Sequence, residues 1–545
     1  MNNIVNIKYN EELYNSLFIK KFNNKDLLGA LLITNSIEKL PSFDRQELAV
    51  KRARVFYYMQ EYSLACNEWF KYLSLTNDKK LIARAYNGLG ACFYKLNDLK
   101  LARYYFNAQL SSDMHALFEY SSVTAEFYQE ILSVEKNYYL AYPYEKADFT
   151  NALERADEYL KIGEVDKVIE LLKEVPASSK QYSVALVTLS IAKYFLGEIE
   201  DALVDIEKSI EIEDSIIAIC NAISMFFAVE NKEKVEYYLN LLKQKDIIED
   251  DDVYKATMVY LEQGEDELAY NLAQKYLKNN KYNLSMLLLV GILNYNNANY
   301  DKAEQLFKKA YQISNSYIFR YYLKISQNKS YKKLSYTLDL QDKDRAKIVK
   351  KISEFLKLES DIRKEFEDEI LEISSYAIST SVYQIQSTAV ALLGELNTNK
   401  SLEFIKKMLI SLDIYDRVKA GALGFLVASG VEGEVGAVFS SIYKSISIYK
   451  AVFDDNKVFN EAYAYAFSKV APLERDTLKL KESAENIYNT LKEKEMLGSV
   501  QDVKALAALM FELSGIKKIL SRREFAKFFS ANLREIKKIK EMLGQ

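Results

Sequence analysis

Apolar residues recur every three or four positions along most of this chain, which is the spacing that lines one face of an α-helix. Short polar stretches interrupt the pattern, so that two apolar runs of about a dozen residues flank each polar turn. This arrangement predicts pairs of antiparallel helices joined by tight connections. Only 16 glycines and 4 prolines occur among 545 residues, which disfavours most β-rich architectures. We therefore expect an all-α fold.

The helix pairs repeat at a nearly constant period. Comparable turn segments begin at positions 163, 197, 230, 264 and 298, and the spacings between them are 34, 33, 34 and 34 residues. Two examples are Gly197-Glu-Ile-Glu-Asp-Ala202 and Ala298-Asn-Tyr-Asp-Lys-Ala303. A fixed period of this length is typical of stacked helical hairpins, none of which can bury its apolar face alone.

The best copy of the repeat reads Leu287-x3-Gly291-x3-Tyr295 and then Tyr300-x2-Ala303-x3-Phe307-x2-Ala310. This pattern resembles the tetratricopeptide (TPR) repeat, and two earlier copies match it around positions 53–69 and 86–106. The proline expected at the end of each unit is almost absent. The resemblance implies a right-handed superhelix whose first helices line a concave groove that binds a segment of another protein.

A different pattern follows the TPR-like repeats. The motif Val418-Lys419-x2-Ala422-x3-Leu426 has counterparts that begin at Ile385 and Val503, and it is similar to the HEAT repeat, with Lys or Gln in place of Arg. We expect four parts: a capping hairpin at 1–44, about eight TPR-like units at 45–328 with a degenerate unit at 111–144, a basic bridge at 329–351, and a HEAT-like helical domain at 352–545.

In the TPR family, fixed positions of each first helix line the groove. Here the twelfth position is aromatic in five of seven units, and from residue 182 onward the lining positions are mostly apolar. Three interpretations stay open: the aromatic residues contact a partner, tyrosine is simply common at this position of the repeat, or a tight superhelix buries these residues. The candidate partner-binding residues are Tyr94, Val187, Ile191, Tyr194, Phe227, Tyr254, Met258, Leu288, Ile292 and Tyr295.

Two further surfaces bear on partner choice. Some TPR proteins clamp a C-terminal carboxylate with Lys and Asn, but Val50 and Arg54 occupy those positions here, which argues against that clamp. The segment 198–214 holds eight carboxylates and one lysine. It is either a solvated helix face or a docking site for a basic segment. The final helix, expected at 522–543, is apolar on one face and basic elsewhere, so it either caps the solenoid or contacts a partner.

The chain lacks the residues that most enzyme classes require. Its single histidine is His115, its three cysteines form no C-x-x-C pair, and no glycine-rich phosphate-binding motif occurs. We expect no catalytic residues, no metal site and no cofactor. The net charge of −4 and the absence of a long apolar run disfavour nucleic-acid binding and a transmembrane segment.

The sequence therefore predicts a non-enzymatic scaffold of a bacterial cytoplasm, which binds a peptide or helix of a partner protein in an apolar groove. One alternative is a regulatory sensor that changes shape when a peptide binds. Another is a nucleic-acid-associated protein that uses the basic bridge and the C-terminal helix. The sequence does not reveal the oligomeric state.

Overall fold

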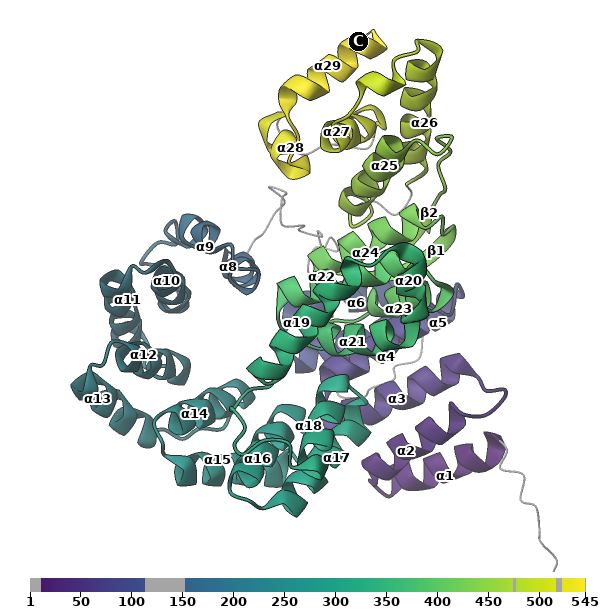
Figure 1. Cartoon of the computed structure of the whole chain (residues 1–545). Helices are drawn as coiled ribbons and strands as arrows, with labels where there is room; N and C mark the ends of the chain where they lie inside the picture. The colour runs from purple at the N-terminus through teal and green to yellow at the C-terminus, as the bar shows by residue number, and fades with distance from the viewer. Residues whose placement is uncertain (1–10, 113–151, 474–476, 516–521, 545) are drawn as a thin grey trace, which may run out of the picture. The chain divides into compact units, whose positions relative to one another are not determined.

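The computed structural model describes residues 11–112, 152–473, 477–515 and 522–544, which form two compact units. Unit 1 combines the N-terminal residues up to Ala147 with residues from Asp342 onward, and unit 2 spans Asp148–Gln341. Helices make up most of the described residues, which confirms the expected all-α helical-repeat fold (Figure 1). All of the predicted degenerate unit 111–144 after its first two residues, including His115, lies outside the described residues.

Unit 2 is a row of antiparallel helix pairs, in which the two helices of each pair pack against each other (Figure 1). The first helices of the pairs are α8, α10, α12, α14 and α16, and α18 follows the last pair. The bounds are α8 Ala152–Lys161, α9 Val165–Leu172, α10 Tyr182–Leu196, α11 Ile199–Ile212, α12 Ile216–Ala228, α13 Lys232–Lys243, α14 Asp250–Glu262, α15 Asp266–Asn279, α16 Leu284–Asn296, α17 Tyr300–Ser314 and α18 Tyr317–Asn328.

The turn of each pair has the left-handed backbone that the repeat requires. Gly163, Gly197 and Gly264 have φ angles of 77°, 84° and 74°, which glycine adopts without a steric penalty. Glu230 and Ala298 occupy the same turn position with φ angles of 58° and 60°. The five turns predicted from the 34-residue period are therefore present, and they confirm the TPR-like repeat.

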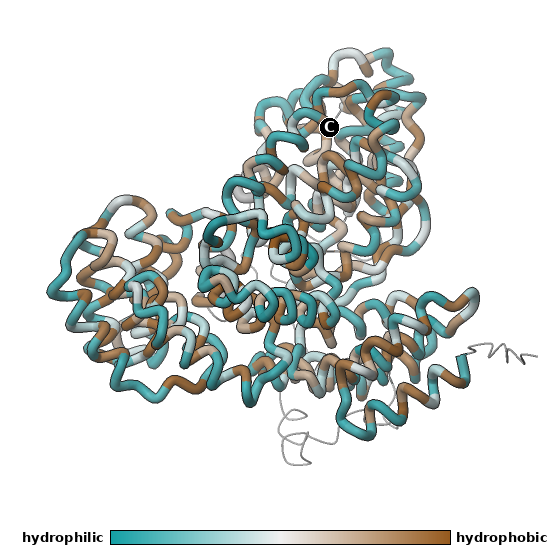
Figure 2. Tube along the Cα trace, turned by 60° about the horizontal axis from the view of Figure 1, so that its bottom comes forward, coloured by the Kyte–Doolittle hydropathy of each residue, from teal (hydrophilic) through white to brown (hydrophobic). Residues whose placement is uncertain are grey.

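Small residues set the distance between the helices of a pair. A Cβ atom added to Gly291 of α16 would lie 2.3 Å from the ring of Phe307 on α17. Ala303, which is fully buried, gives α17 the matching close approach. Apolar residues of α10 to α16 then form one continuous core. Figure 2 shows hydrophobic and hydrophilic residues alternating along the helical trace, as amphipathic helices require.

The N-terminal part of unit 1 contains three further helix pairs. Their helices are α1 Glu11–Asn23, α2 Leu27–Ile37, α3 Arg45–Met59, α4 Tyr62–Leu73, α5 Lys79–Lys95 and α6 Leu99–Ser112. These pairs contact the C-terminal part of the unit through hydrogen bonds. The Asn67 side-chain oxygen accepts from the Leu412 amide at 2.9 Å, and the Tyr105 hydroxyl donates to the Ser441 carbonyl at 2.5 Å.

The C-terminal part of unit 1 is mainly helical but contains one β-hairpin that the sequence analysis missed. The strands β1 Gly433–Phe439 and β2 Ile442–Ile448 pair antiparallel through a two-residue turn at Ser440 and Ser441, both with positive φ. The helices are α19 Asp342–Leu356, α20 Ser360–Glu365, α21 Glu367–Ile378, α22 Tyr383–Leu396, α23 Asn399–Met408, α24 Asp416–Ala428, α25 Lys457–Val470, α26 Leu478–Glu493, α27 Val503–Leu513, α28 Arg522–Phe529 and α29 Leu533–Leu543, with a 3-10 turn at Leu497–Ser499.

Buried polar side chains join the helices of this part. Lys419 is 1% exposed, and its ammonium group donates to the Val438 carbonyl at 2.5 Å and the Ser411 carbonyl at 3.2 Å. Gln386, in the corresponding motif, donates to the carbonyls of Thr380 and Asp413. The third motif differs, because Lys504 is exposed. Whether these helices are HEAT repeats stays a prediction.

Two expected segments differ from the structure. The second half of the predicted bridge is helical, because α19 begins at Asp342. The expected single helix 522–543 is broken between α28 and α29, where Ser530 has a φ angle of 49° and Asn532 caps α29. Phe528, Phe529 and Ile536 are buried in the core of unit 1, so these helices pack on the unit. Among the described residues, no helix is long and apolar enough to cross a bilayer.

Candidate functional site

The most informative feature of unit 2 is a non-helical segment, residues 330–341, which we call the strap. It begins after α18 ends at Lys329, whose φ angle of 49° turns the chain out of the helix. The strap has no strand pairing, so side chains must satisfy its backbone groups. Leu334 and Leu340 are each 1% exposed, which means that the strap is packed against the helices of the unit.

Two adjacent residues at the end of α16 bind the strap backbone. The Tyr295 hydroxyl donates to the Tyr331 carbonyl at 2.7 Å and accepts from the Tyr331 amide at 3.0 Å. The Asn296 amide group donates to the Leu334 carbonyl at 2.9 Å, and its oxygen accepts from the Leu334 amide at 2.7 Å. A side-chain amide can pair with a peptide group in this way because it has both a donor and an acceptor.

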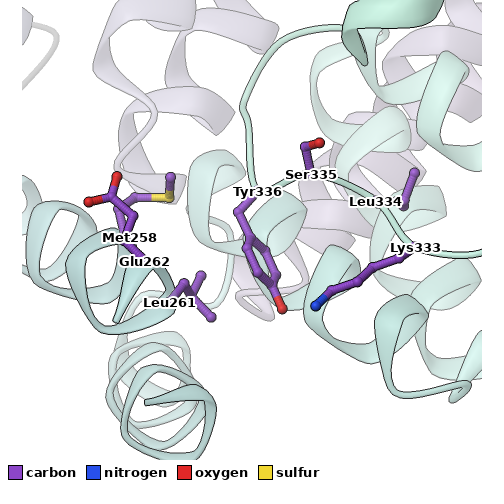
Figure 3. A pocket seen from close by; sticks show the side chains of 7 residues that line it. All are labelled: Met258, Leu261, Glu262, Lys333, Leu334, Ser335 and Tyr336. Carbon is purple, nitrogen blue, oxygen red and sulfur yellow. The ribbon is translucent and has the colours of Figure 1, made fainter. Parts of the chain in front are cut away.

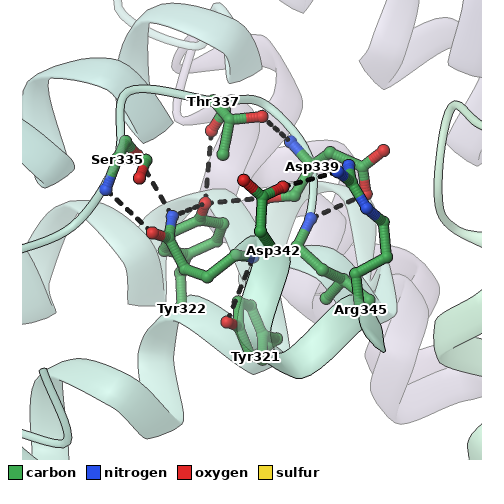
Figure 4. A network of polar contacts seen from close by, with 9 residues as sticks. Tyr321, Tyr322, Ser335, Thr337, Asp339, Asp342 and Arg345 are labelled. Carbon is green, nitrogen blue, oxygen red and sulfur yellow. Dashed lines mark hydrogen bonds and ion pairs between the residues drawn. The ribbon is translucent and has the colours of Figure 1, made fainter. Parts of the chain in front are cut away.

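A second polar network fixes the far end of the strap (Figure 4). The buried Tyr322 hydroxyl of α18 donates to the Asp339 carbonyl at 2.7 Å and accepts from the Gln341 side chain at 2.9 Å. The Gln341 side chain also pairs with both backbone groups of Ser335, at 2.8 and 3.1 Å. Burial raises the pKa of Tyr322, so its hydroxyl stays protonated and able to donate.

The structure places nine of the ten predicted partner-binding residues in unit 2, while Tyr94 belongs to unit 1. They divide into two groups. The buried part contains Leu288, Ile292 and Tyr295 of α16, which are at most 1% exposed, together with Val187 of α10. The open part is partly or fully exposed and lies on three successive first helices: Ile191, Tyr194, Phe227, Tyr254 and Met258. Their role in partner binding stays a prediction.

The open part consists of apolar side chains on three helices, and one of them, Met258, lines a pocket together with the strap. Ile191, Tyr194, Tyr254 and Met258 pack on the same hydrophobic core, and so does Tyr336 of the strap. Phe227 is 54% exposed, which is unusual for a phenylalanine within a row of packed helices. The helices α10, α12 and α14 contact one another in sequence. The surface therefore offers several aromatic and aliphatic side chains to a ligand.

A pocket of about 490 Å³ lies where the open part meets the strap. Met258, Leu261 and Glu262 of α14 form one wall, and strap residues 333–336 form the other. In Figure 3, Tyr336 points into the space between Leu261 and Lys333, while the Glu262 carboxylate lies beside Met258. The pocket therefore combines apolar side chains with an acidic group on one wall and a basic group on the other.

Glu262 is exposed, and its carboxylate accepts one hydrogen bond from the Ser224 hydroxyl of α12 at 2.9 Å. Burial, with a smaller contribution from this carboxylate, raises the pKa of Tyr254. The Tyr254 phenol therefore stays protonated at neutral pH and can donate a hydrogen bond. The open part thus combines apolar area with a few polar groups at its edge.

Neighbouring lysines partly neutralise the acidic segment 198–214. Asp205 pairs with Lys193 at 2.7 Å and Glu207 with Lys234 at 2.5 Å, and Asp214 also pairs with Lys245. These pairs join α11 to neighbouring helices, which favours a solvated and structurally paired face over a docking site for a basic segment.

Metal and thiol chemistry find little support in the described residues. No group of three or more metal-ligating side chains occurs among them. Cys66, Cys92 and Cys220 are buried, and burial raises the pKa of Cys220 to about 12 and that of Cys66 well above its usual range. Thiols in such environments are poor nucleophiles.

Together, the helix pairs and the strap-bound face define a helical-repeat protein with an apolar first-helix surface. No family model matches the chain, and no curated protein matches it in sequence. Among solved structures, it is similar to a tetratricopeptide repeat protein from Parabacteroides merdae ATCC 43184, with 16% identity, a TM-score of 0.27, and 52% of this chain and 99% of the other covered.

It is also similar to yeast Tom70, with 14% identity, a TM-score of 0.21, and 97% of this chain and 96% of the other covered. Neither likeness identifies a partner for this chain.

Sequence reasoning missed three elements of this site: the strap, Asn296 and Glu262. The repeat itself contained a signal for the two side chains. Glu262 and Asn296 hold the same position in consecutive units, two residues before the turn, next to the twelfth position. The strap had no comparable signal, because its residues follow no helical or strand period.

Proposed function

We propose that this protein is a non-enzymatic protein–protein interaction scaffold that binds an apolar segment of a partner protein on the open part of unit 2. The observation that carries the proposal is the exposure of Phe227, together with the partial exposure of Tyr194, Tyr254 and Met258, on first helices that contact one another. An exposed aromatic cluster next to a pocket is a typical protein-binding surface, because aromatic side chains lose little conformational entropy when they bind.

The strap gives independent support. It shows that the end of α16 holds a non-helical segment through Tyr295 and Asn296 and that a leucine of that segment becomes buried. The same chain therefore already contains one bound segment of the kind that the proposal requires. The buried part is occupied by the strap at Tyr295, whereas the open part remains available to a partner.

The test uses a photo-crosslinking amino acid in the full chain, expressed in its native host. We expect a crosslinker at position 227 to yield a discrete partner adduct. A crosslinker at position 237 is the matched control, since Tyr237 is 62% exposed but lies on the second helix α13. Equal adducts at both positions, or adducts at 237 only, would contradict binding at the open part.

The alternatives receive no comparable support. A nucleic-acid-associated role relied on the basic bridge and the C-terminal helix, but half of that bridge is the strap, and α28 and α29 bury their apolar faces in unit 1. A sensor that changes shape remains compatible with the open part. It differs from a static scaffold only if a bound segment alters the strap or the packing of the repeats.

A further inference from the structure

We infer that the open part selects an extended segment in which a lysine or arginine adjoins an apolar residue, with the cation beside Glu262 and the apolar side chain in the pocket. The inference rests on the proposed function and specifies the chemistry of the partner. It follows from the strap, from the repeat register and from the charge at the edge of the open part.

The strap shows how this surface holds a segment. Tyr295 and Asn296 bind the backbone at Tyr331 and Leu334, and the Leu334 side chain is buried. The residue before the buried leucine is Lys333, whose side chain is exposed and lines the pocket. The internal ligand is therefore an extended segment in which a basic residue adjoins an apolar anchor.

The repeat register transfers this arrangement to the preceding unit. Leu261 and Glu262 stand 34 residues before Tyr295 and Asn296, and they line the pocket together with Met258. Asn296 offers a donor and an acceptor and so pairs with a peptide group. Glu262 offers only acceptors, and its best partner is a cation. The amide of Asn296 therefore binds a peptide backbone, whereas the carboxylate of Glu262 at the equivalent position favours a cation.

The surrounding charges favour the same ligand. The exposed Glu262 is the last residue of α14, where the helix dipole adds negative potential. No ion pair involving Glu262 occurs within the described residues, in contrast to Asp205 and Glu207 of α11, which pair with lysines. Lys333 lies on the opposite wall of the pocket, and a partner cation therefore faces Glu262 rather than the strap.

The test measures fluorescence anisotropy of two labelled peptides with the full chain at low ionic strength. One peptide has the sequence of residues 329–336, Lys-Ser-Tyr-Lys-Lys-Leu-Ser-Tyr, and the other has glutamine in place of its three lysines. We expect the wild-type chain to bind the lysine peptide about fivefold more tightly, the range of a charge-assisted contact at a partly exposed site.

Charge reversal at Glu262 identifies the position. Glu262→Lys should abolish the preference for the lysine peptide. Glu236→Lys is the control, since Glu236 is exposed on the second helix α13 and should leave the preference unchanged. If circular dichroism shows that Glu262→Lys disturbs the fold, Glu262→Gln replaces it, with the same expectation.

The inference is wrong if neither peptide binds, if wild type does not distinguish the peptides, or if the preference survives the change at Glu262. Crosslinking at position 227 separates this failure from that of the proposed function. Partner adducts at 227 without any charge preference would leave the scaffold role intact and remove only the selectivity for a basic segment.

Discussion

In two consecutive repeats of unit 2, the residues at the same two positions have different surroundings. In α16, Tyr295 and Asn296 are bound to the strap, whereas in α14, Leu261 and Glu262 line a pocket that is open on one side. The helix pairs are alike in length and period. The comparison therefore shows that the backbone of the repeat provides the surface, while single side chains decide whether a segment of the same chain occupies it.

The difference has a simple physical origin. A buried, non-helical segment must pair its backbone groups, since an unpaired buried amide or carbonyl costs about 1–3 kcal/mol. Asn296, Tyr295 and Gln341 supply those partners to the strap. The α14 repeat offers one exposed carboxylate instead, which cannot donate to a carbonyl. Among the described residues, strap residues 333–336 accordingly form no hydrogen bond with α14, and Met258 stays partly exposed at the pocket.

The largest effect on this comparison should come from the buried anchor of the strap. Leu334→Ala removes a side chain that is 1% exposed and should destabilise strap docking by about 2–4 kcal/mol, the usual range for buried leucines. Hydrogen exchange measured by mass spectrometry on peptides covering 330–341 would show faster exchange. Met258→Ala, on the partly exposed wall, is the control and should change that exchange little. Equal protection in both variants would contradict a docked strap.

The phenol of Tyr322 should have the next largest effect. Tyr322→Phe removes the hydroxyl that joins the Asp339 carbonyl to the Gln341 side chain, both inside the packed network. Two buried polar groups then lose a partner, and we expect a loss of about 1–3 kcal/mol in strap docking. The same exchange measurement applies. Tyr311→Phe on α17 is the control, because it makes the same change from tyrosine to phenylalanine outside the network. An equal effect in that variant would show that the hydrogen bonds of Tyr322 do not hold the strap.

The fold of this region was predictable because the repeat is local. The five turns, the close approach at Gly291 and the small Ala303 all leave a signature within one 34-residue unit. The strap leaves none, since its side-chain contacts with α16 and α18 join residues 15 to 38 positions apart. The sequence interpretation therefore treated 329–351 as a linker, although its first half is packed on unit 2.

The β-hairpin of unit 1 was missed for a different reason. Ile442, Ile446 and Ile448 alternate with more exposed residues, which is the period of a strand. The preceding stretch is mostly apolar apart from Glu432 and Glu434, and a short apolar run does not distinguish a buried helix from a strand. The hairpin is fixed by tertiary contacts such as the Lys419 ammonium group on the Val438 carbonyl, which no local pattern reveals.

A smaller effect should separate the two equivalent polar positions. Asn296→Ala removes both hydrogen bonds to Leu334 and should weaken strap docking by about 1–2 kcal/mol. Glu262→Ala removes one exposed contact with Ser224 and should change docking by less than about 0.5 kcal/mol. Exchange of the Leu334 amide, resolved by fragmentation mass spectrometry, reports the difference directly. If both variants accelerate exchange equally, the hydrogen bonds of the Asn296 side-chain amide are not what holds the strap in place.

The smallest effect, and the most specific, should follow from giving α14 the residue of α16. Glu262→Asn replaces the acceptor-only carboxylate with an amide that can pair with a peptide group, while the side chain becomes only slightly shorter. We expect the lysine and glutamine peptides to bind this variant equally, and the glutamine peptide to bind up to about threefold more tightly than it binds wild type. Anisotropy titrations measure both values. A variant that keeps the lysine preference would show that a group other than the Glu262 carboxylate attracts the cation.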